Sequence, residues 1–382
     1  MTVAGFTSTG SKRPAALFGD TDERLESRLE SCDGCTIRTA DGREYLDFMM
    51  SLGAMSLGYN HRDVRQAAIE ALERGVVGSL SPTDEEALAS ELAAVIPWCE
   101  SVRFLKTGAE AVAAAVRIAR TATGRDLVLG CGYHGWLDWC SAEPGVPTAV
   151  TRLYATIPFN NTDRTRDAIR AAGTRLACVV IEPVIDGPPD AEWLALLRDE
   201  CTGTGALLIF DEVKTAFRLA TGGAAERWGV RPDLMVLGKA MASGFPLAAV
   251  GGPAHFMKAV ERTWISSTAA TEFVSFAAAR ATVAAFGRER VAGHLERIGN
   301  RLLEGLQRIV VDNPRLGIDA AGLPQMCYLR YADESLGQRV AVACADRGLL
   351  FKRNAYNFVS LAHDDAAIDR ALAILGEILA SC

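Results

Sequence analysis

ALLIFDEV (206–213) and LMVLGKAMASGFP (234–246) are apolar runs that each lead into a charged residue, Asp211 in the first and Lys239 in the second. Runs of Val, Ile, Leu and Phe without polar interruption are typical of strands that are buried on both faces, as in a parallel sheet. A carboxylate in such a strand is costly unless it is paired. A lysine at this place is poorly placed for solvation and well placed to bond covalently to a molecule in a cleft.

The same alternation of apolar strand and helix extends over residues 101–252. Near-continuous apolar runs predict strands at 102–106, 127–131, 151–156, 176–183, 206–213, 234–238 and 247–252. Helical patterns separate several of them, at 109–122, 165–172 and 191–202. Alternation of this kind is typical of α/β layer folds, so we expect a mostly parallel seven-stranded sheet flanked by helices.

The regions on either side have a different pattern. ADGREYLDF (40–48) predicts a hairpin arm with a turn at Asp41-Gly42. Further elements are expected as helices at 63–74, 84–95, 273–286, 294–311, 338–347 and from Asp364, and as strands at 325–332, 348–352 and 357–363. We expect an N-terminal segment (1–55), a large domain (56–286) and a small C-terminal domain (287–382). The N-terminal segment and the C-terminal region would form one smaller α+β domain.

The bulk composition disfavours several classes of protein. The 382 residues are 49% hydrophobic and 7% aromatic and carry a net charge of −7, with no run of more than two Lys or Arg. That balance disfavours nucleic acid and anionic membranes as partners. The N-terminus lacks the apolar segment of a signal peptide, and no apolar stretch approaches the ~18 residues of a membrane helix. We expect a soluble, cytoplasmic protein.

Ten cysteines are scattered along the chain. Cys178 and Cys344 lie in apolar runs, where thiols serve as small core residues. Cys32 and Cys35 form the one suggestive pair, but a zinc site usually needs a second pair or two histidines at fixed spacing. We expect a turn there, with no metal and no disulfide. A metal or redox role for this pair is the alternative.

KTGAEA (106–111) lies where a predicted strand turns into a helix. Gly108 lets the backbone approach a ligand closely, and the free amides of the first helical turn point outward at the positive end of the helix dipole. This turn is therefore a candidate phosphate site. The alternative is that Thr107 and Gly108 serve only the geometry of the turn.

GCGYHG (130–135) matches the spacing G-x-G-x-x-G, which occurs in dinucleotide-binding proteins. We reject that interpretation, because the following residues do not open a helix and no acidic residue ends a strand ~20 positions later. Tyr133 is instead an aromatic residue at a strand end, available to stack on a planar cofactor ring. For His134 we favour a structural, hydrogen-bonded role over a catalytic one.

Lys239 and Asp211 together point to pyridoxal phosphate (PLP). The lysine would form an imine with the cofactor and, once a substrate amine displaces it, would serve as general base and acid. The aspartate would keep a proton on the pyridine nitrogen, which makes the ring an electron sink. Val213 points to the same side and could pack on the ring. The alternatives are a snorkelling lysine and an aspartate that caps a helix or pairs with Arg218.

Five motifs follow one another in a family's order: FLKTGAEA, GYHGW, IEPV, FDEVKTAFR and WGVRPDLMVLGKAMASGFPLAAVGG. In them the chain resembles the class III aminotransferases of PLP fold type I, most closely the branch that contains glutamate-1-semialdehyde 2,1-aminomutase. Lys239 would then be the Schiff-base lysine. Thr268 would reach the phosphate of the neighbouring subunit's cofactor, which implies a homodimer. The cofactor-binding residues implied by the resemblance are Gly108, Ala109, Tyr133, Asp211, Val213, Lys239 and Thr268.

The chain also departs from the family pattern. Ala109 stands where the family usually has Ser or Thr, so one hydroxyl contact with the phosphate is missing. After IEPV the branch carries Gly-Asn, with the asparagine near the ring hydroxyl, whereas residues 186–188 here are Asp-Gly-Pro. The segment after GYHGW is much shorter than the gating segment of the aminomutase.

The resemblance also places five candidate substrate contacts near the cleft, although packing or salt bridges could explain each of them. Glu272 would discourage an anionic substrate and Arg353 would favour one, so the charge of the substrate stays open. The five residues are Trp136, Lys214, Glu272, Arg353 and Tyr356.

The resemblance implies a ping-pong aminotransferase. An amino donor would convert PLP to pyridoxamine phosphate, and an aldehyde or ketone acceptor would then take the amine. The alternative is an intramolecular aminomutase of the glutamate-1-semialdehyde type. We favour transfer between molecules, because a mutase must retain its intermediate and the gating segment here is short. A cofactor-binding protein without turnover is disfavoured by the presence of both Lys239 and Asp211.

Overall fold

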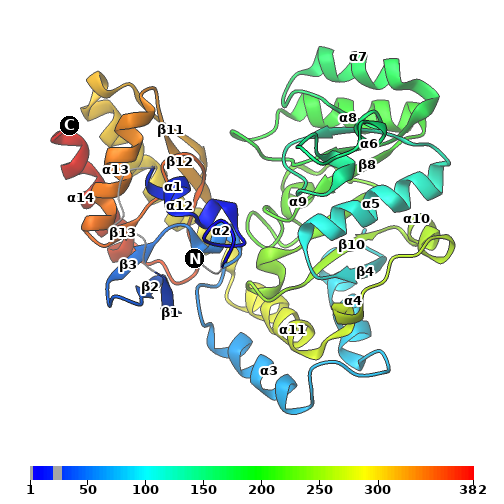
Figure 1. Ribbon diagram of the computed structural model, residues 1–382, viewed down its shortest axis with the longest axis horizontal. Coiled ribbons are helices and arrows are strands. Elements are labelled where there is room, and N and C mark those ends of the chain that lie inside the picture. The colour runs from blue at the N-terminus through cyan, green and yellow to red at the C-terminus, as the bar shows by residue number, and fades with distance from the viewer. Residues whose placement is uncertain (1–2, 20–27) are drawn as a thin grey trace. The chain divides into compact units, whose positions relative to one another are not determined.

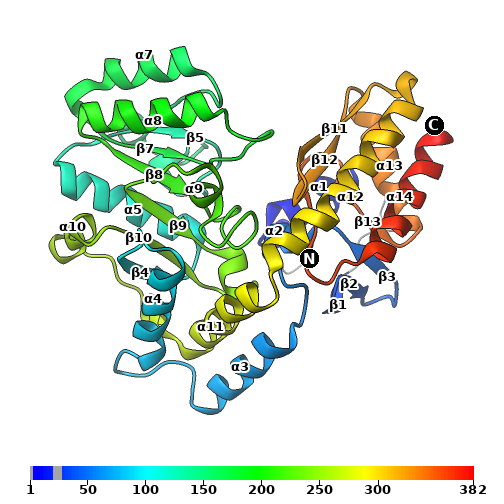
Figure 2. The same cartoon turned by 180° about the vertical axis from the view of Figure 1, so that it is seen from behind.

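The computed structural model describes residues 3–19 and 28–382, and the chain divides into two compact units (Figures 1 and 2). One unit is Arg62–Ala292, and the other combines Met1–His61 with Gly293–Cys382. The block of alternating strands and helices that the sequence predicts lies in the first of them. In the described part of the chain, every helix is too short or too polar to cross a membrane.

The unit of residues 62–292 is built on one seven-stranded sheet with the order β4-β10-β9-β8-β7-β5-β6. β10 is antiparallel to both of its neighbours and the other strand pairs are parallel, so the prediction of a mostly parallel seven-stranded sheet is confirmed. The strands are β4 Ser101–Leu105, β5 Leu127–Cys131, β6 Tyr154–Thr156, β7 Leu176–Ile181, β8 Leu207–Asp211, β9 Leu234–Leu237 and β10 Ala248–Gly252.

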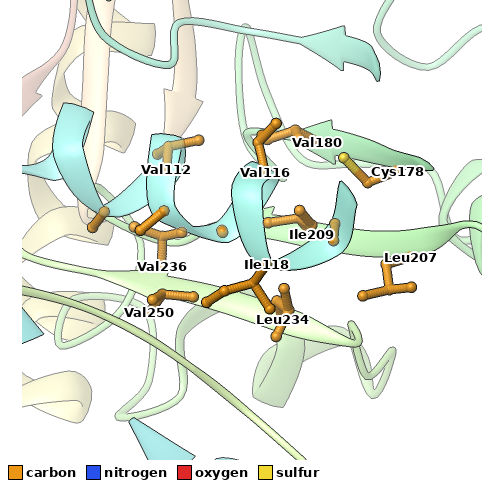
Figure 3. Close-up of a cluster of buried hydrophobic side chains, with 14 of the residues drawn as sticks. Val112, Val116, Ile118, Cys178, Val180, Leu207, Ile209, Leu234, Val236 and Val250 are labelled. Atoms are coloured by element: carbon orange, nitrogen blue, oxygen red, sulfur yellow. The ribbon is translucent and has the colours of Figure 1, made fainter. Parts of the chain in front are cut away.

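Helices cover both faces of this sheet. α5 (Gly108–Thr123) packs on one face, and Figure 3 shows its valines and isoleucine among side chains of β7 to β10. α7 (Thr162–Ala172) and α8 (Ala191–Thr204) pack on the other face. Ile209 faces α5 and Phe210 faces α8, so the alternation places Asp211 on the α5 face. The remaining helices are α3 Arg62–Glu73, α4 Thr83–Val95, α6 Thr148–Thr151, α9 Gly223–Trp228, α10 Ala254–Met257 and α11 Phe273–Arg288.

The other unit has a smaller α+β structure with two sheets, of order β1-β2-β3-β13 and β11-β12-β14. β2 and β3 form the hairpin predicted at Asp41-Gly42, where Gly42 has φ +86°. The strands are β1 Leu29–Asp33, β2 Thr36–Thr39, β3 Glu44–Asp47, β11 Ile318–Leu323, β12 Met326–Tyr331, β13 Leu349–Leu350 and β14 Asn357–Phe358. The helices are α1 Pro14–Phe18, α2 Met50–Gly53, α12 Val291–Asp312, α13 Glu334–Asp346 and α14 Asp365–Ala380, and α12 begins at the boundary between the units.

The cysteine pair of the sequence lies in this second unit. Cys32 is in β1, and Cys35 is in the turn that leads into β2. Burial raises the pKa of both thiols, and nearby carboxylates raise it further. Within residues 3–19 and 28–382, no three His, Cys, Asp or Glu side chains are grouped so that they could hold a metal ion.

Candidate active site

Three of four neighbouring strands carry the candidate residues at their carboxyl ends. β9, β8, β7 and β5 are adjacent and parallel, so their carboxyl ends point the same way. Lys239 follows β9, Asp211 ends β8, and Tyr133 and His134 follow β5. The order of the strands therefore gathers residues that lie far apart in the sequence, at the place where open α/β sheets usually bind ligands.

Asp211 is held from two sides. Its Oδ2 lies 3.0 Å from Nδ1 of His134, and its Oδ1 accepts the N–H of Val213 at 3.3 Å. Asp211 and His134 are both almost fully buried. The ring of His134 stacks on Trp139, and its Nε2 has no hydrogen-bond partner in the described structure. Because an ionised carboxylate can only accept hydrogen bonds, the imidazole acts as the donor through Nδ1–H.

Lys239 lies in a strained loop beside this carboxylate. Asp211 pairs with Val236 across β8 and β9, and Lys239 follows at the end of β9 with φ +45°. Burial lowers the pKa of its ammonium, and the charges of Lys214 and Arg218 lower it further against the opposite effect of Asp211 and Glu182. A lysine in such surroundings holds more of the neutral, nucleophilic amine than an exposed one.

The start of α5 forms a cradle next to Val213, two residues beyond Asp211. The side chain of Thr107 caps the helix by accepting the N–H of Glu110, whose carboxylate in turn accepts the N–H of Thr107 at 2.9 Å. The amides of Gly108 and Ala109 have no partner among the described residues, as is usual in a first helical turn. A Cβ on Gly108 would lie 3.2 Å from both methyl groups of Val213, so glycine keeps this wall close to the turn.

Tyr133 is open to solvent, with 71% of its surface exposed. Its backbone N–H donates to Oε2 of Glu182 at 2.7 Å, and Oε1 of the same carboxylate lies 2.9 Å from Nζ of Lys214. Lys214, which the sequence offers as a substrate contact, is therefore paired with an acid that the sequence analysis did not assign.

Three further candidates from the sequence, Glu272, Trp136 and Thr268, lie in the same unit. Glu272 caps α11 by accepting the amides of Val274 and Ser275, and it pairs with Nζ of Lys106 at 2.7 Å. Burial alone would raise the pKa of Glu272, but the bonds from Lys106 and Ser275 outweigh it and hold the pKa below its usual value. Its charge is thus compensated. Trp136 is 74% exposed, and Thr268 is exposed in a short turn before α11.

Arg353 and Tyr356 belong to the other unit. Nη1 of Arg353 lies 3.0 Å from Oε1 of Glu334, while its Nε is buried and has no partner in the described structure. The ring of Tyr356 packs edge-on against Tyr328, with 5.4 Å between the ring centroids. Both residues have packing partners within their own unit.

Two acids of this site escaped the sequence analysis. Glu182 ends the apolar run of β7, and Glu212 directly follows Asp211. Glu212 is fully buried and accepts hydrogen bonds from Thr215 and from the amides of Ala224 and Ala225 at the start of α9. The available signal was an acid at the carboxyl end of a buried strand, the same signal that singled out Asp211.

Comparison with known proteins gives one consistent family. The family model for class III aminotransferases matches residues 20–379. The glutamate-1-semialdehyde 2,1-aminomutase of Desulfosudis oleivorans is 33% identical over 382 aligned residues, which cover 90% of this chain and 89% of that protein. The β-phenylalanine aminotransferase of Variovorax paradoxus superposes with a TM-score of 0.89 at 27% identity, covering 100% of this chain and 91% of that one. The FumI protein of Sphingopyxis sp. MTA144, solved in a PLP-containing form, superposes with a TM-score of 0.89 at 25% identity, covering 92% and 88%.

Proposed function

This chain belongs to the class III aminotransferases, and from that premise we propose that it transfers an amino group from a donor amine to an aldehyde or ketone acceptor with PLP as cofactor. The observation that carries the proposal is the pair at the ends of β8 and β9. A lysine with a lowered pKa lies beside a buried carboxylate that a histidine holds in place. When bound, PLP supplies an aldehyde that condenses with amines and a protonated ring that withdraws electrons from the reacting carbon.

The residues present fit this cofactor. The glycine at 108 leaves room for a phosphate against two free amides, in the field of a helix N-terminus. Val213 provides an apolar wall between Gly108 and Gly238, since a Cβ on either glycine would come within 3.6 Å of both of its methyl groups. Asp211 presents a buried carboxylate, which suits a protonated pyridine nitrogen. The open face of Tyr133 is of the right kind to stack on the other side of the ring.

Each residue of the chain would then have a defined task. Asp211 keeps the proton on the ring nitrogen, and His134 fixes the orientation of the Asp211 carboxylate. Lys239 would bind the cofactor covalently, and once released its amine would take a proton from the substrate carbon and deliver it to the cofactor carbon that receives the amine. A neutral amine is needed for both tasks, which its lowered pKa provides. The amides of Gly108 and Ala109 hold the phosphate.

We further propose that the chain acts as a homodimer, with Thr268 completing the phosphate site of the partner. Thr268 is exposed and has no described partner for its hydroxyl in its own chain. Large apolar side chains are also exposed in this unit, Trp264 at 82% and Leu80 at 85%. In the proposed dimer a second copy would cover these side chains.

The test is amine exchange. The purified protein is incubated with PLP, with pyruvate or 2-oxoglutarate as acceptor, and with a panel of donor amines, and formation of alanine or glutamate is measured. Reduction with borohydride followed by peptide mass spectrometry should place a phosphopyridoxyl group on Lys239. A protein that exchanges no amine with any donor, and that fixes no label, would exclude the proposal.

The second candidate function is intramolecular amino transfer. The curated relative from Desulfosudis oleivorans carries the name glutamate-1-semialdehyde 2,1-aminomutase, and a second such relative from Thermomicrobium roseum is 34% identical over 387 aligned residues. An aminomutase would isomerise glutamate 1-semialdehyde from the pyridoxamine form of the enzyme without added donor. Isomerisation that outpaces exchange with free amines would favour this candidate over the first.

A further inference from the structure

One carboxylate connects three of the strand ends in the candidate active site. Glu182 follows β7, and its two oxygens reach in opposite directions. Oε2 accepts the backbone N–H of Tyr133, beyond β5, at 2.7 Å, and Oε1 lies 2.9 Å from Nζ of Lys214, beyond β8. The chain Tyr133–Glu182–Lys214 therefore crosses the edge of the sheet from β5 to β8.

This arrangement is enclosed. The side chains of Glu182 and Lys214 are only 14% and 13% exposed, so their ion pair is less screened by solvent than a surface pair. Gly132 has φ +108°, and a Cβ there would lie 2.7 Å from Oε2 of Glu182. The glycine next to Tyr133 thus makes the space that this carboxylate occupies.

We propose that Glu182 and Lys214 are a pair of positioning residues that fixes the peptide carrying Tyr133, and that the Lys214 ammonium serves Glu182 rather than a substrate carboxylate. The proposal rests on the proposed function only in the task given to Tyr133 as a cover for the cofactor. Each member of the pair satisfies the other: Lys214 compensates the charge of Glu182, and Glu182 provides the acceptor for the amide of Tyr133.

The pair also sets the electrostatic surroundings of Lys239. The charge of Lys214 lowers the pKa of Lys239 and the charge of Glu182 raises it, so the two contributions oppose each other. Removing the Lys214 charge should therefore raise the pKa of Lys239, removing the Glu182 charge should lower it, and removing both should leave it between these two results.

The experiment measures the pH dependence of Lys239 acylation by acetic anhydride in the cofactor-free full-length protein, quantified by peptide mass spectrometry. We expect Lys214→Met to move the midpoint of the profile to higher pH and Glu182→Gln to move it to lower pH, with the double variant between the two single variants. Lys214→Arg, which keeps the charge, should leave the midpoint in place and guards against a folding defect in Lys214→Met.

Matched controls come from a similar pair in the same unit. Asp233 accepts the N–H of Leu208 at 2.7 Å and pairs with Nη2 of Arg198 at 2.9 Å, so it also joins one backbone amide to one cation. Arg198→Met and Asp233→Asn should leave the Lys239 profile unchanged.

A second measurement tests the positioning itself. Glu182→Ala and Tyr133→Ala should each weaken PLP binding several-fold, and the double variant should be no worse than Tyr133→Ala. The proposal is overturned if Lys214→Met leaves the acylation profile unchanged and instead raises KM only for carboxylated donors. Acylation needs no cofactor, so a wild type that fails to bind PLP would remove the proposed function without affecting the test of the pair.

Discussion

His134 and Asp211 form a buried hydrogen bond at the end of β8, with Nδ1 and Oδ2 3.0 Å apart. His134 lies beyond β5, and the two strands are separated in the sheet by β7. The histidine therefore reaches past one strand to hold the carboxylate that we assign to the cofactor ring. This bond explains why a buried histidine follows the aromatic residue in GYHGW.

Replacing His134 tests that bond directly. His134→Ala leaves the buried carboxylate without its donor, which costs about 1–3 kcal/mol, so PLP retention and kcat should each fall on the order of tenfold. His134→Asn can place an amide N–H near the former Nδ1 and should recover much of the loss, whereas His134→Gln, which reaches further, should not. PLP dissociation followed by absorbance and steady-state kinetics provide the measurements. Equal behaviour of the Ala and Asn variants would contradict the assignment.

Gly108 and Val213 provide a second, separable test. Gly108→Ala places a methyl group 3.2 Å from the methyl groups of Val213, which is overpacked and should cost about 1 kcal/mol or more of unfolding free energy. The displaced turn should also bind PLP several-fold more weakly. Val213→Ala opens the space, so the double variant should be more stable and bind PLP better than Gly108→Ala alone. Additive losses in thermal unfolding and in PLP affinity would mean that the two residues do not act through this contact.

The sheet could be predicted from the sequence because its strands are buried on both faces. β5, at Leu127–Cys131, begins and ends where the apolar run does. β6 was predicted from residue 151 but covers only Tyr154–Thr156, because residues 148–151 form a short helix after Pro147 and this edge strand has one neighbour. Apolar runs thus predict the bounds of strands reliably in the centre of the sheet, whereas local turn chemistry decides the bounds of the edge strand.

The smaller unit was harder to predict for local reasons. β11, Ile318–Leu323, was missed, since its central residues are small and only pairing with β12 makes it a strand. The strand predicted at 357–363 stops after Phe358. There Nδ1 of His363 accepts the N–H of Ser360, and this local side-chain bond replaces a strand partner. Neither feature leaves a periodic signal in the sequence.

The residue types of the candidate site could be predicted, but the pairings could not. The motifs single out Lys239, Asp211 and Tyr133 because each stands at the end of an apolar strand. The bonds of His134 with Asp211 and of Glu182 with Lys214 depend on the order β8-β7-β5, which the sequence does not fix. Lys214 is a candidate substrate contact only through the resemblance, and its ion pair with Glu182 could not be predicted because the sequence does not place the two side chains together.

Glu212 predicts a definite pH dependence of stability. Burial raises the pKa of this carboxyl from 4.5 to about 7, against hydrogen bonds from Thr215, Ala224 and Ala225. Between these two values the folded protein keeps a proton that the unfolded chain has lost. The contribution of Glu212 is therefore complete below pH 4.5 and is lost as the pH rises through about 7. Asp47, whose pKa burial raises to about 6, acts in the same direction.

Glu212→Gln removes this titration, so the free energy of unfolding should fall less steeply between pH 5 and pH 7.5 in the variant than in the wild type. Urea unfolding followed by circular dichroism at a series of pH values measures both slopes. Because the amide would face the N–H groups of α9, the variant can be less stable at every pH, and the slope rather than the absolute value is diagnostic. Parallel curves would show that Glu212 does not titrate in this range.

Thr268 allows the proposed dimer to be tested by mixing two inactive sites. If Thr268 serves the partner subunit, a chain carrying Thr268→Ala keeps its own Lys239 but spoils its neighbour's phosphate site, and a chain carrying Lys239→Ala does the reverse. A dimer of one chain of each kind then contains one site with both residues intact. Random association should restore about a quarter of the wild-type sites, counted as borohydride-fixed PLP on Lys239 at limiting PLP.

If Thr268 acts within its own chain, the mixed dimer holds no intact site and the count stays at the level of the separate variants. Light scattering of the wild type tests whether the protein is a dimer at all, since in a monomer the exposed Thr268 would have no partner subunit to serve.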